Sequence, residues 1–385
     1  MRPGASGESA YGRRIGRVLW LLPLWLLALG RLAQAEVPAP SPTPVWEPSS
    51  VENDLPESRA ESAYPYLSTR GQLQLQFDDG DRGAARGDDP VYNGLGPLRA
   101  ADRLDIRRAR VVTSLHLSPE LQIINESNYD TRTNAITVLD LYMRAQLGQN
   151  LDLRAGMFKI PFGWEGLRSS RSTNLIEMSD VTRAISNFRD SGLSLGYQNG
   201  RLECTVAAVQ GQGGVWTDRN SAKDVVARIH YELQPGLYLG ASGHLGSFRP
   251  EFQDRDLPVR RLGLEMQYHE DDWKVEAEYL WSWGFNYVAR GDTRADGFYL
   301  TLVRQLDERN DVIVSFDRFD PDHSFTSLDR VVNETNTRNR LVLGWNYYFK
   351  RKPENRLMVN YEWVNEEEGP RIDNDGLRVR YQFAW

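Results

Sequence analysis

Hydrophobic and polar residues alternate with a period of two along the last ten residues of the chain, from Gly376 to Trp385. One face of this stretch collects apolar and aromatic side chains: Leu377, Val379, Tyr381, Phe383 and Trp385. The other face carries Arg378, Arg380 and Gln382. Such alternation predicts a β-strand with one apolar face and one face in contact with water.

The same pattern recurs along the chain and predicts about sixteen strands. The stretch 273–285 has the most apolar face, opposite Lys274, Glu276 and Glu278. The predicted strands span about 71–77, 103–117, 121–129, 136–147, 151–160, 191–197, 202–210, 224–233, 236–245, 260–268, 273–285, 296–306, 311–319, 339–349, 356–364 and 376–385.

The connections between these strands are sorted by length. Short turns of breaker residues fall at 119–120, 148–150, 199–200, 234–235, 270–272, 307–310 and 351–355. They alternate with longer polar connections at about 78–102, 130–135, 161–190, 211–223, 246–259, 286–295, 320–338 and 365–375. Tight turns at one end, long loops at the other and an even strand number are the plan of a bacterial outer-membrane barrel. The sequence therefore predicts an all-β fold, a transmembrane antiparallel β-barrel over residues 71–385.

The N-terminus has the features of a targeting segment. Arg13, Arg14 and Arg17 precede the apolar run 18–30, and Ala33-Gln34-Ala35 supplies small residues for a signal peptidase. We expect residues 1–35 to be a cleaved signal peptide that directs the chain to the bacterial outer membrane. Residues 36–70 are rich in proline, glutamate and serine, and we expect a flexible periplasmic segment there.

Composition agrees with this plan. A mean hydropathy of −0.55 suits a barrel, because only every second strand residue faces lipid. Residues 1–35 hold five Arg and one Glu, so their removal takes the formal charge from −7 to −11. An acidic chain argues against a nucleic-acid partner. The single cysteine, Cys204, excludes an internal disulfide, and we expect it to be a buried or lipid-facing small residue.

The sequence contains no recognisable catalytic constellation. The five His are scattered, no nucleophile-elbow or nucleotide-binding pattern is present, and Cys204 has no partner that the sequence identifies. We therefore predict a protein that is not an enzyme, without catalytic residues, metal or cofactor.

One segment resembles a known family. The stretch Leu153–Glu165, with Gly156, Phe158, Lys159, Pro161, Phe162, Gly163 and Glu165, resembles the G-Q-F-K-x-P-F-G-x-E motif of the phosphate-selective porin O and P family. Glu177 and Ser179 resemble its next element, and the stretch 188–193 resembles its F-R-D-x-G segment. The residues Arg107-Arg108-Ala109-Arg110 are similar to the R-R-A-R strand of that family.

The resemblance implies an outer-membrane porin, a water-filled channel that forms a homotrimer, with the loop after the fifth strand folded inward to narrow the pore. Cationic side chains at such a constriction favour anions, and guanidinium groups suit phosphate oxygens. The candidate anion-binding residues are Lys159, Arg168, Arg171, Arg183 and Arg189 in the loop, and Arg144 and Arg154 on the adjacent strands.

Several alternatives stay open at this point. The candidate cations are interleaved with acids such as Glu165, Glu177, Asp180 and Asp190, which pair with them in a purely structural reading. This interleaving predicts a channel for small hydrophilic solutes and anions more firmly than specificity for phosphate. A structural or adhesive outer-membrane barrel with a blocked lumen is a second hypothesis. A secreted soluble β-sandwich that binds glycans is a third.

Overall fold

The structure is a computed structural model, and it describes residues 64–79, 103–130, 134–186, 188–211, 213, 218, 220–249, 255–284, 293–321, 337–349, 355–367 and 375–385. The chain divides into two units, Met1–Pro44 and Val45–Trp385, and every described residue belongs to the second. The predicted signal peptide and most of the predicted proline-rich segment lie outside the described residues.

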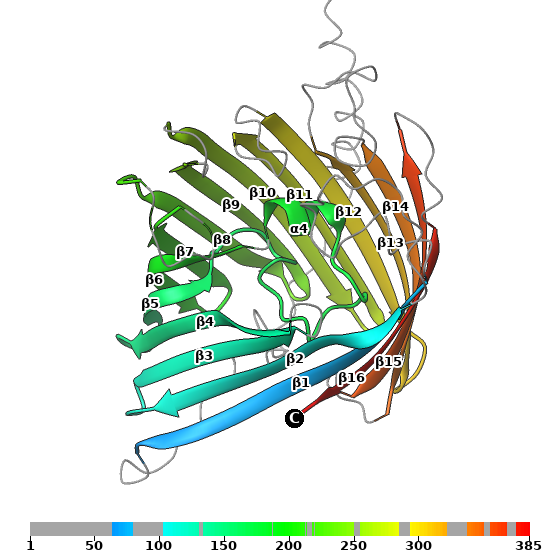
Figure 1. Cartoon of the computed structure of the whole chain (residues 1–385), viewed down its shortest axis with the longest axis horizontal. Helices are drawn as coiled ribbons and strands as arrows, with labels where there is room; N and C mark the ends of the chain where they lie inside the picture. Colours follow the sequence, from blue (N-terminus) through cyan, green and yellow to red (C-terminus); the bar gives the residue numbers. More distant parts are fainter. Residues whose placement is uncertain are drawn as a thin grey trace, which may run out of the picture. The chain divides into compact units, whose positions relative to one another are not determined.

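The described part of the chain holds sixteen strands and one short helix (Figure 1). They are β1 (Tyr66–Asp78), β2 (Arg103–His116), β3 (Leu121–Asp130), β4 (Ala135–Gln146), β5 (Leu151–Lys159), α4 (Asp180–Ile185), β6 (Arg189–Asn199), β7 (Leu202–Val209), β8 (Asp224–Gln234), β9 (Leu237–Phe248), β10 (Leu257–Glu270), β11 (Trp273–Gly284), β12 (Thr293–Gln305), β13 (Asn310–Asp320), β14 (Arg338–Tyr348), β15 (Arg356–Glu366) and β16 (Gly376–Ala384).

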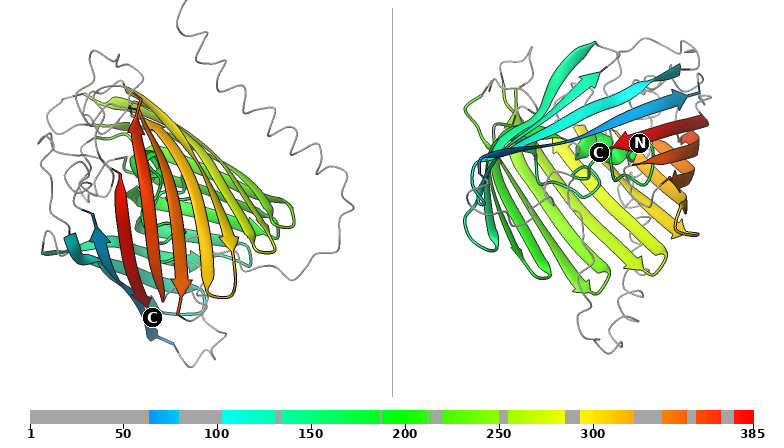
Figure 2. Two further views of the ribbon diagram at one scale, coloured as in Figure 1. Left: turned by 90° about the vertical axis from the view of Figure 1, so that its right-hand side faces the viewer. Right: turned by 90° about the horizontal axis from the view of Figure 1, so that it is seen from below.

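All sixteen strands form one closed antiparallel sheet. Each strand pairs with its neighbours in sequence, and β1 pairs with β16 to close the barrel, as the blue and red strands of Figure 2 show. A sandwich needs two sheets packed face to face. The single closed sheet therefore rules out the soluble sandwich and confirms the predicted barrel.

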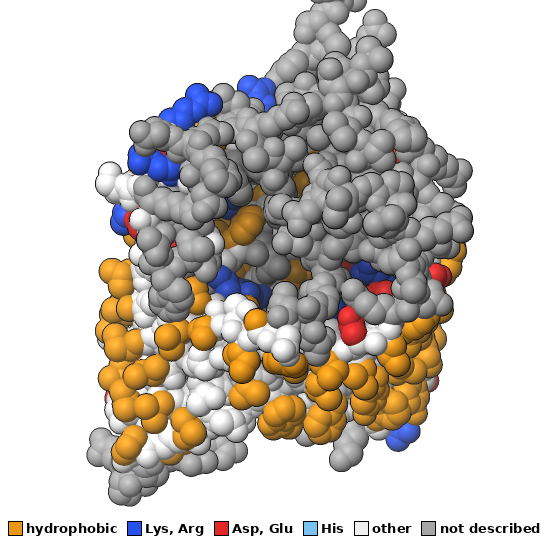
Figure 3. Space-filling view, viewed as in Figure 1, with side chains coloured by type: hydrophobic (Ala, Val, Ile, Leu, Met, Phe, Trp, Pro, Cys, Tyr) orange, Lys and Arg blue, Asp and Glu red, His pale blue; other side chains and the backbone are white. Residues whose placement is uncertain are grey.

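The period-two pattern separates the two faces of the barrel wall. On β14, Leu343 and Trp345 point outward with 44% and 38% of their surface exposed, whereas Arg340 and Asn346 are 1% exposed. Tyr381 on β16 is likewise outward and 39% exposed, next to the fully buried Arg380. The outward side chains form the apolar surface seen in Figure 3. The inward side chains are polar, as expected for a barrel in a membrane.

Strand β1 begins at Tyr66, five residues before the predicted start at Gly71. The Tyr66 ring stacks on His116 with 4.2 Å between ring centroids, and Ser68 bonds the His116 Nε2 at 2.9 Å. Leu67 pairs with Leu115 on β2. The sequence places these residues in the flexible segment, but a cross-strand partner on β2 extends the strand through them.

The predicted short turns join their strands, but the sorting by length is not strict, because only four residues separate β3 from β4, whereas seven separate β14 from β15. Gly200 and Gly236 have φ of 54° and 81°, and Asp271 has φ of 48°. These left-handed conformations allow two-residue turns between antiparallel strands. The longer connections lie largely outside the described residues, except for the segment between β5 and β6.

Candidate functional site

The connection between β5 and β6 runs inside the barrel (Figure 1). It enters through the corner Ile160-Pro161-Phe162-Gly163, where Phe162 is completely buried. Gly163 has φ of 72°, and a side chain there would meet Glu278 Oε1 at 2.4 Å. Only glycine combines this left-handed backbone with such a close approach. The corner therefore fixes where the segment leaves the wall.

The barrel wall binds the backbone of this segment at many points. Glu278 on β11 accepts hydrogen bonds from the backbone N–H groups of Trp164 at 2.8 Å and Glu165 at 3.2 Å. Further bonds join Ser242 to the Gly163 N–H, Asn360 to the Ile176 N–H, Asn346 to the Asn174 carbonyl, Arg340 to the Met178 carbonyl, Gln74 to the Ser170 carbonyl, and Arg356 and Gln382 to the Arg171 carbonyl. These partners come from β1, β9, β11, β14, β15 and β16, so many parts of the wall position the segment.

Glu165 and Ser179, two residues of the family-like motif, form hydrogen bonds with each other and so connect two parts of the segment. The Glu165 carboxylate accepts from Ser179 Oγ at 2.7 Å and from the Ser179 N–H at 3.0 Å. Ser179 in turn caps α4, because its Oγ accepts from the Thr182 N–H at 3.2 Å. Burial raises the pKa of the Glu165 carboxyl, and the bonds from Ser179 only partly oppose this shift.

Lys159, the first predicted anion-binding residue, binds the segment. Its Nζ donates to the carbonyls of Gly166 and Arg168 at 2.9 and 2.7 Å, and a third carbonyl, of Leu167, lies at 3.5 Å. The ammonium group thus donates hydrogen bonds to several carbonyl oxygens of one turn and fixes that turn to the end of β5.

The other predicted residues of the segment also have partners. Arg168 Nη1 donates to Glu276 Oε2 at 2.8 Å, and Arg183 Nη2 lies 2.6 Å from Asp180 Oδ1. The carbonyl of Arg171 accepts bonds from two wall residues. Burial opposes ionisation of Arg183, but the adjacent Asp180 outweighs it and raises the arginine pKa.

The remaining three predicted residues lie on strands, as Lys159 does, and face acids of the wall. Arg189 Nε donates to Asp140 Oδ1 at 2.8 Å. Arg144 and Arg154 are paired in register on β4 and β5 and share Asp152, whose Oδ2 lies 3.6 and 3.2 Å from them. Each of these three arginines therefore forms an ion pair with an acid of the wall, as the purely structural reading expects.

A cavity inside the barrel brings four of the seven predicted residues together. It lies between the segment and the wall strands, and Arg144, Arg171 and Arg183 are not part of its lining. Its charged lining consists of six cations and three carboxylates: Arg110, Arg154, Lys159, Arg168, Arg189, Arg228, Glu126, Asp140 and Glu203. Sequence reasoning missed Arg110 and Arg228, although both stand at inward positions of alternating strands, which is the signal that identifies them.

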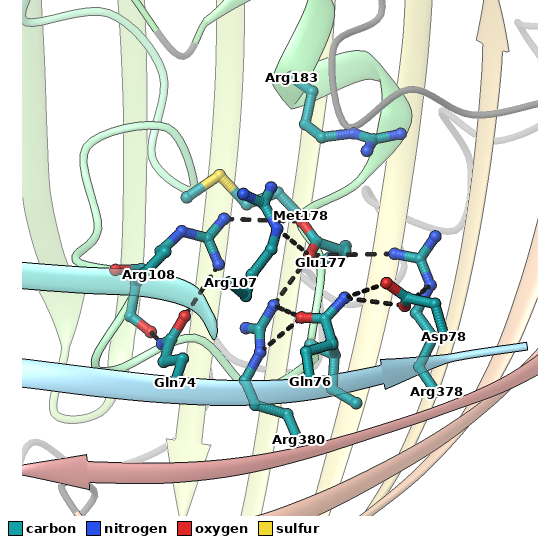
Figure 4. Close-up of polar contacts among 12 residues, drawn as sticks. Gln74, Gln76, Asp78, Arg107, Arg108, Glu177, Met178, Arg183, Arg378 and Arg380 are labelled. Atoms are coloured by element: carbon teal, nitrogen blue, oxygen red, sulfur yellow. Dashed lines mark hydrogen bonds and ion pairs between the residues drawn. The ribbon is translucent and has the colours of Figure 1, made fainter. Parts of the chain in front are cut away.

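Sequence reasoning also missed a second group of cations. Arg107, Arg108, Arg378 and Arg380, here called the arginine cluster, surround Glu177 of the segment (Figure 4). Arg380 Nη2 is 2.8 Å from Glu177 Oε1, and the nearest nitrogens of the other three lie 3.5 to 3.9 Å from the carboxylate. Burial raises the pKa of Glu177, but the four guanidinium groups outweigh it and hold this pKa well below its ordinary value.

A β-bulge places two adjacent arginines in this cluster. Gln74 pairs with Arg108 and Leu75 pairs with Ile106, so Arg107 is the extra residue of β2. Regular alternation sends neighbouring side chains to opposite faces. The bulge interrupts this alternation at Arg107. The guanidinium groups of both Arg107 and Arg108 therefore reach Glu177.

No group of three or more His, Cys, Asp or Glu side chains that could hold a metal ion occurs in the described ranges. Within the same ranges, no helix has the length and apolar character needed to cross a membrane. Cys204 is a free, half-buried thiol, paired in register with the outward Tyr197 and Ile229.

Residues 98–257 match the family described as Phosphate-selective porin O and P. Among solved structures, the outer membrane channel DcaP of Acinetobacter baumannii superposes with a TM-score of 0.64 at 13% identity, over 83% of this chain and 97% of that one. An anion-selective porin from Comamonas acidovorans gives 0.55 at 10% identity, over 83% and 99%.

The trimer form of OmpT, an outer membrane protein of Vibrio cholerae, gives 0.54 at 10% identity, over 83% and 99%. No curated protein sequence matches the chain. At these identities the structural likenesses establish the fold.

Proposed function

We propose that this barrel, of which residues 98–257 match the Phosphate-selective porin O and P family, is an outer-membrane porin and a passive channel with a preference for small anions, phosphate among them. Solutes diffuse past the segment between β5 and β6, which forms the constriction. The process involves no covalent step and no cofactor.

The observation that carries the anion preference is the charge of the cavity lining. Six cations and three carboxylates line the cavity, so positive groups predominate on the surface that a solute meets, while Asp152, Glu276 and Glu265 bind Arg154, Arg168 and Arg228 from outside the lining. In a narrow passage with walls of low dielectric constant, such an excess concentrates anions and repels cations. The formal charge of −7 for the whole chain does not oppose this, because charges more than about 10 Å away in salt solution are screened.

The reversal potential of single channels in a KCl gradient tests the proposal. We expect a potential of the sign that reports chloride as the more permeant ion. A potential of the opposite sign would contradict the anion preference and leave the barrel unaffected. Inorganic phosphate in place of chloride then measures whether phosphate passes or binds.

The packing of the segment supports the second candidate, a barrel with a blocked lumen. Phe162, Ile176 and Val181 are at most 2% exposed inside the barrel, so the segment occupies much of the interior. A structural or adhesive barrel of this kind would give no discrete conductance steps in a planar bilayer. The proposed channel gives them.

We also propose that the chain assembles as a homotrimer through the outer faces of β1, β2 and β3. Four polar residues lie together there, at positions where regular alternation points to lipid: Thr69, Thr113, Asn125 and Ser127. Asn125 Nδ2 donates to Ser127 Oγ at 3.2 Å, but lipid tails satisfy none of the remaining donors and acceptors. A second copy of the chain can satisfy them and can cover this face.

A further inference from the structure

Three outward residues form a row across the neighbouring strands β10, β11 and β12 (Figure 1). Arg260 pairs in register with Trp283, and Trp283 pairs with Arg294. Both arginines are exposed and Trp283 is half-buried, whereas the adjacent inward residues Arg261 and Ser282 are at most 9% exposed. The three residues, here called the rim row, therefore lie on the outside of the barrel.

The rim row stands at the extracellular end of these strands. The connections at 249–256 and 285–292 have eight residues each, whereas the turn at 271–272 has two. Long connections of an outer-membrane barrel are extracellular and short ones are periplasmic. Trp283 is the second-last residue of β11, and Arg294 is the second residue of β12. The row therefore lies where the wall meets the outer leaflet of the membrane.

The rim row also marks one edge of the apolar band. Trp273 stands on the same outward face of β11, ten residues before Trp283. At about 3.3 Å per residue and a strand tilt of about 40°, the two indoles are about 25 Å apart across the membrane, which is the usual height of the band. Outward leucines lie between these edges: Leu262, Leu264 and Leu300 are 45–48% exposed.

The two edges differ in charge. At Trp283 two guanidinium groups flank one indole, with their central carbons 4.5 and 5.8 Å from a ring centroid. At Trp273 a single arginine, Arg304, lies 4.7 Å from the ring and pairs with Asp272 at 3.2 Å. The register partner of Trp273 on β10 is an acid, Glu270. Anchoring of the barrel at an interface explains either edge alone, but it does not explain why cations gather at the extracellular one.

Two acids of the neighbouring wall have partners outside the rim row. Asp296, the register partner of Trp281, accepts from Tyr279 Oη at 2.7 Å. Glu367 Oε1 accepts from Arg318 Nε at 2.9 Å. Even when Asp296 is counted against one arginine, the rim row keeps a positive excess.

We propose that the rim row is a binding site for the phosphorylated headgroup of a glycolipid in the outer leaflet, of the kind that lipopolysaccharide represents. Guanidinium forks match phosphate oxygens, and an indole is suited to the headgroup level of a membrane. The site faces the membrane and not the lumen, so it applies to a conducting channel and to a blocked barrel alike. Strands β10–β12 are not part of the proposed trimer face on β1–β3.

The test measures binding of a lipopolysaccharide of uniform mass to the folded protein in detergent by native mass spectrometry. Each arginine beside an anionic headgroup contributes about fivefold to binding, so Arg260→Gln is expected to raise the Kd about fivefold, and its combination with Arg294→Gln about 25-fold. Arg304→Gln is the matched control, because it removes the same charge from an arginine beside an indole at the periplasmic edge. Its Kd should equal that of wild type.

An unchanged Kd in the double variant, or an equal rise in Arg304→Gln and Arg260→Gln, would overturn the site. Lipopolysaccharide freed of its phosphate groups by a phosphatase should bind wild type more weakly than the intact lipid, and equal binding would also overturn the proposal. Mobility on unheated gels shows whether each variant folds. If the double variant does not fold, Arg260→Gln decides by the same comparison. The reversal potential in a KCl gradient tests the proposed function separately, so the two proposals fail independently.

Discussion

Gly71 and Trp385 exchange two backbone hydrogen bonds, each 3.1 Å long, at the seam where β1 meets the end of the chain. The indole ring of Trp385 lies over Gly71, and a side chain at Gly71 would meet it at 2.3 Å. The last residue of the chain thereby covers the first strand, and closure of the barrel depends on a position without a side chain.

Gly71→Leu is expected to destabilise the barrel by about 1–3 kcal/mol, the usual cost of overpacking, because the indole must move. The measurement is the urea concentration at which half of the protein loses its folded mobility on an unheated gel. Gly243→Leu is the control, since the space around Gly243 is open. Equal destabilisation by both changes would show that the contact with Trp385 is unimportant.

Gly163→Ala is expected to displace the segment between β5 and β6 and to increase single-channel conductance. The added methyl group combines left-handed strain of about 1–2 kcal/mol with the approach to Glu278 at 2.4 Å. Gly200→Ala introduces similar strain at φ of 54° without any neighbour within 4 Å, so its conductance should equal that of wild type. A conductance of Gly163→Ala that matches wild type would argue against this corner as the anchor.

Arg154→Gln is expected to lower the ratio of chloride to potassium permeability, because it removes one of the six cations of the cavity. The reversal potential in a KCl gradient measures the ratio. Arg304→Gln makes the same change of charge beside Asp272, at a side chain that is 38% exposed, and should have no effect. Identical ratios in the two variants would remove the cavity from the selectivity mechanism.

The difference in unfolding free energy between wild type and Glu177→Gln is expected to depend on pH. The folded-state pKa of Glu177 is depressed, so its contribution is fully present above the unfolded pKa of about 4.3 and is lost as the pH falls through the lower folded value. We expect a constant difference of about 2 kcal/mol from pH 8 to 5 and a smaller one in stronger acid. Urea titrations at each pH measure it, and a difference that disappears between pH 8 and 5 would contradict the assignment.

Asn125→Trp is expected to reduce the trimer fraction, because a large ring on the polar outer face of β3 separates the subunits. Leu343→Trp places the same ring on β14, where the outward leucine is 44% exposed, and should leave assembly unchanged. Native mass spectrometry in detergent gives the oligomeric state. If Asn125→Trp stays trimeric and Leu343→Trp does not, the interface lies at β14 and the proposed interface is wrong.

The sequence predicted the strands well because each strand must show one face to lipid and one to the lumen, and this requirement is local. The early start of β1 at Tyr66 was missed because its cause, the stacking on His116, lies on another strand. Asp180 was among the expected acids and pairs with Arg183, but distant partners were missed for the same reason: Arg189 and Asp140 are 49 residues apart.

The arginine cluster shows a further limit of prediction from alternation. Strict alternation puts Arg107 and Arg108 on opposite faces, and only the bulge in β2 brings both to Glu177. Glu177 itself stands in a connection without regular periodicity, so no local pattern indicates where its side chain points. Contacts of this kind are properties of the closed barrel.

The wall binds the inner segment at many points through backbone N–H and carbonyl groups, which do not depend on the identity of the side chain. Many substitutions in the segment are therefore expected to leave the position of its backbone unchanged. Arg171, for example, is held by bonds from Arg356 and Gln382 to its carbonyl oxygen, which a replacement of its side chain preserves. If the proposed channel is correct, side chains of this segment can be replaced one at a time to change solute preference while the backbone keeps its position.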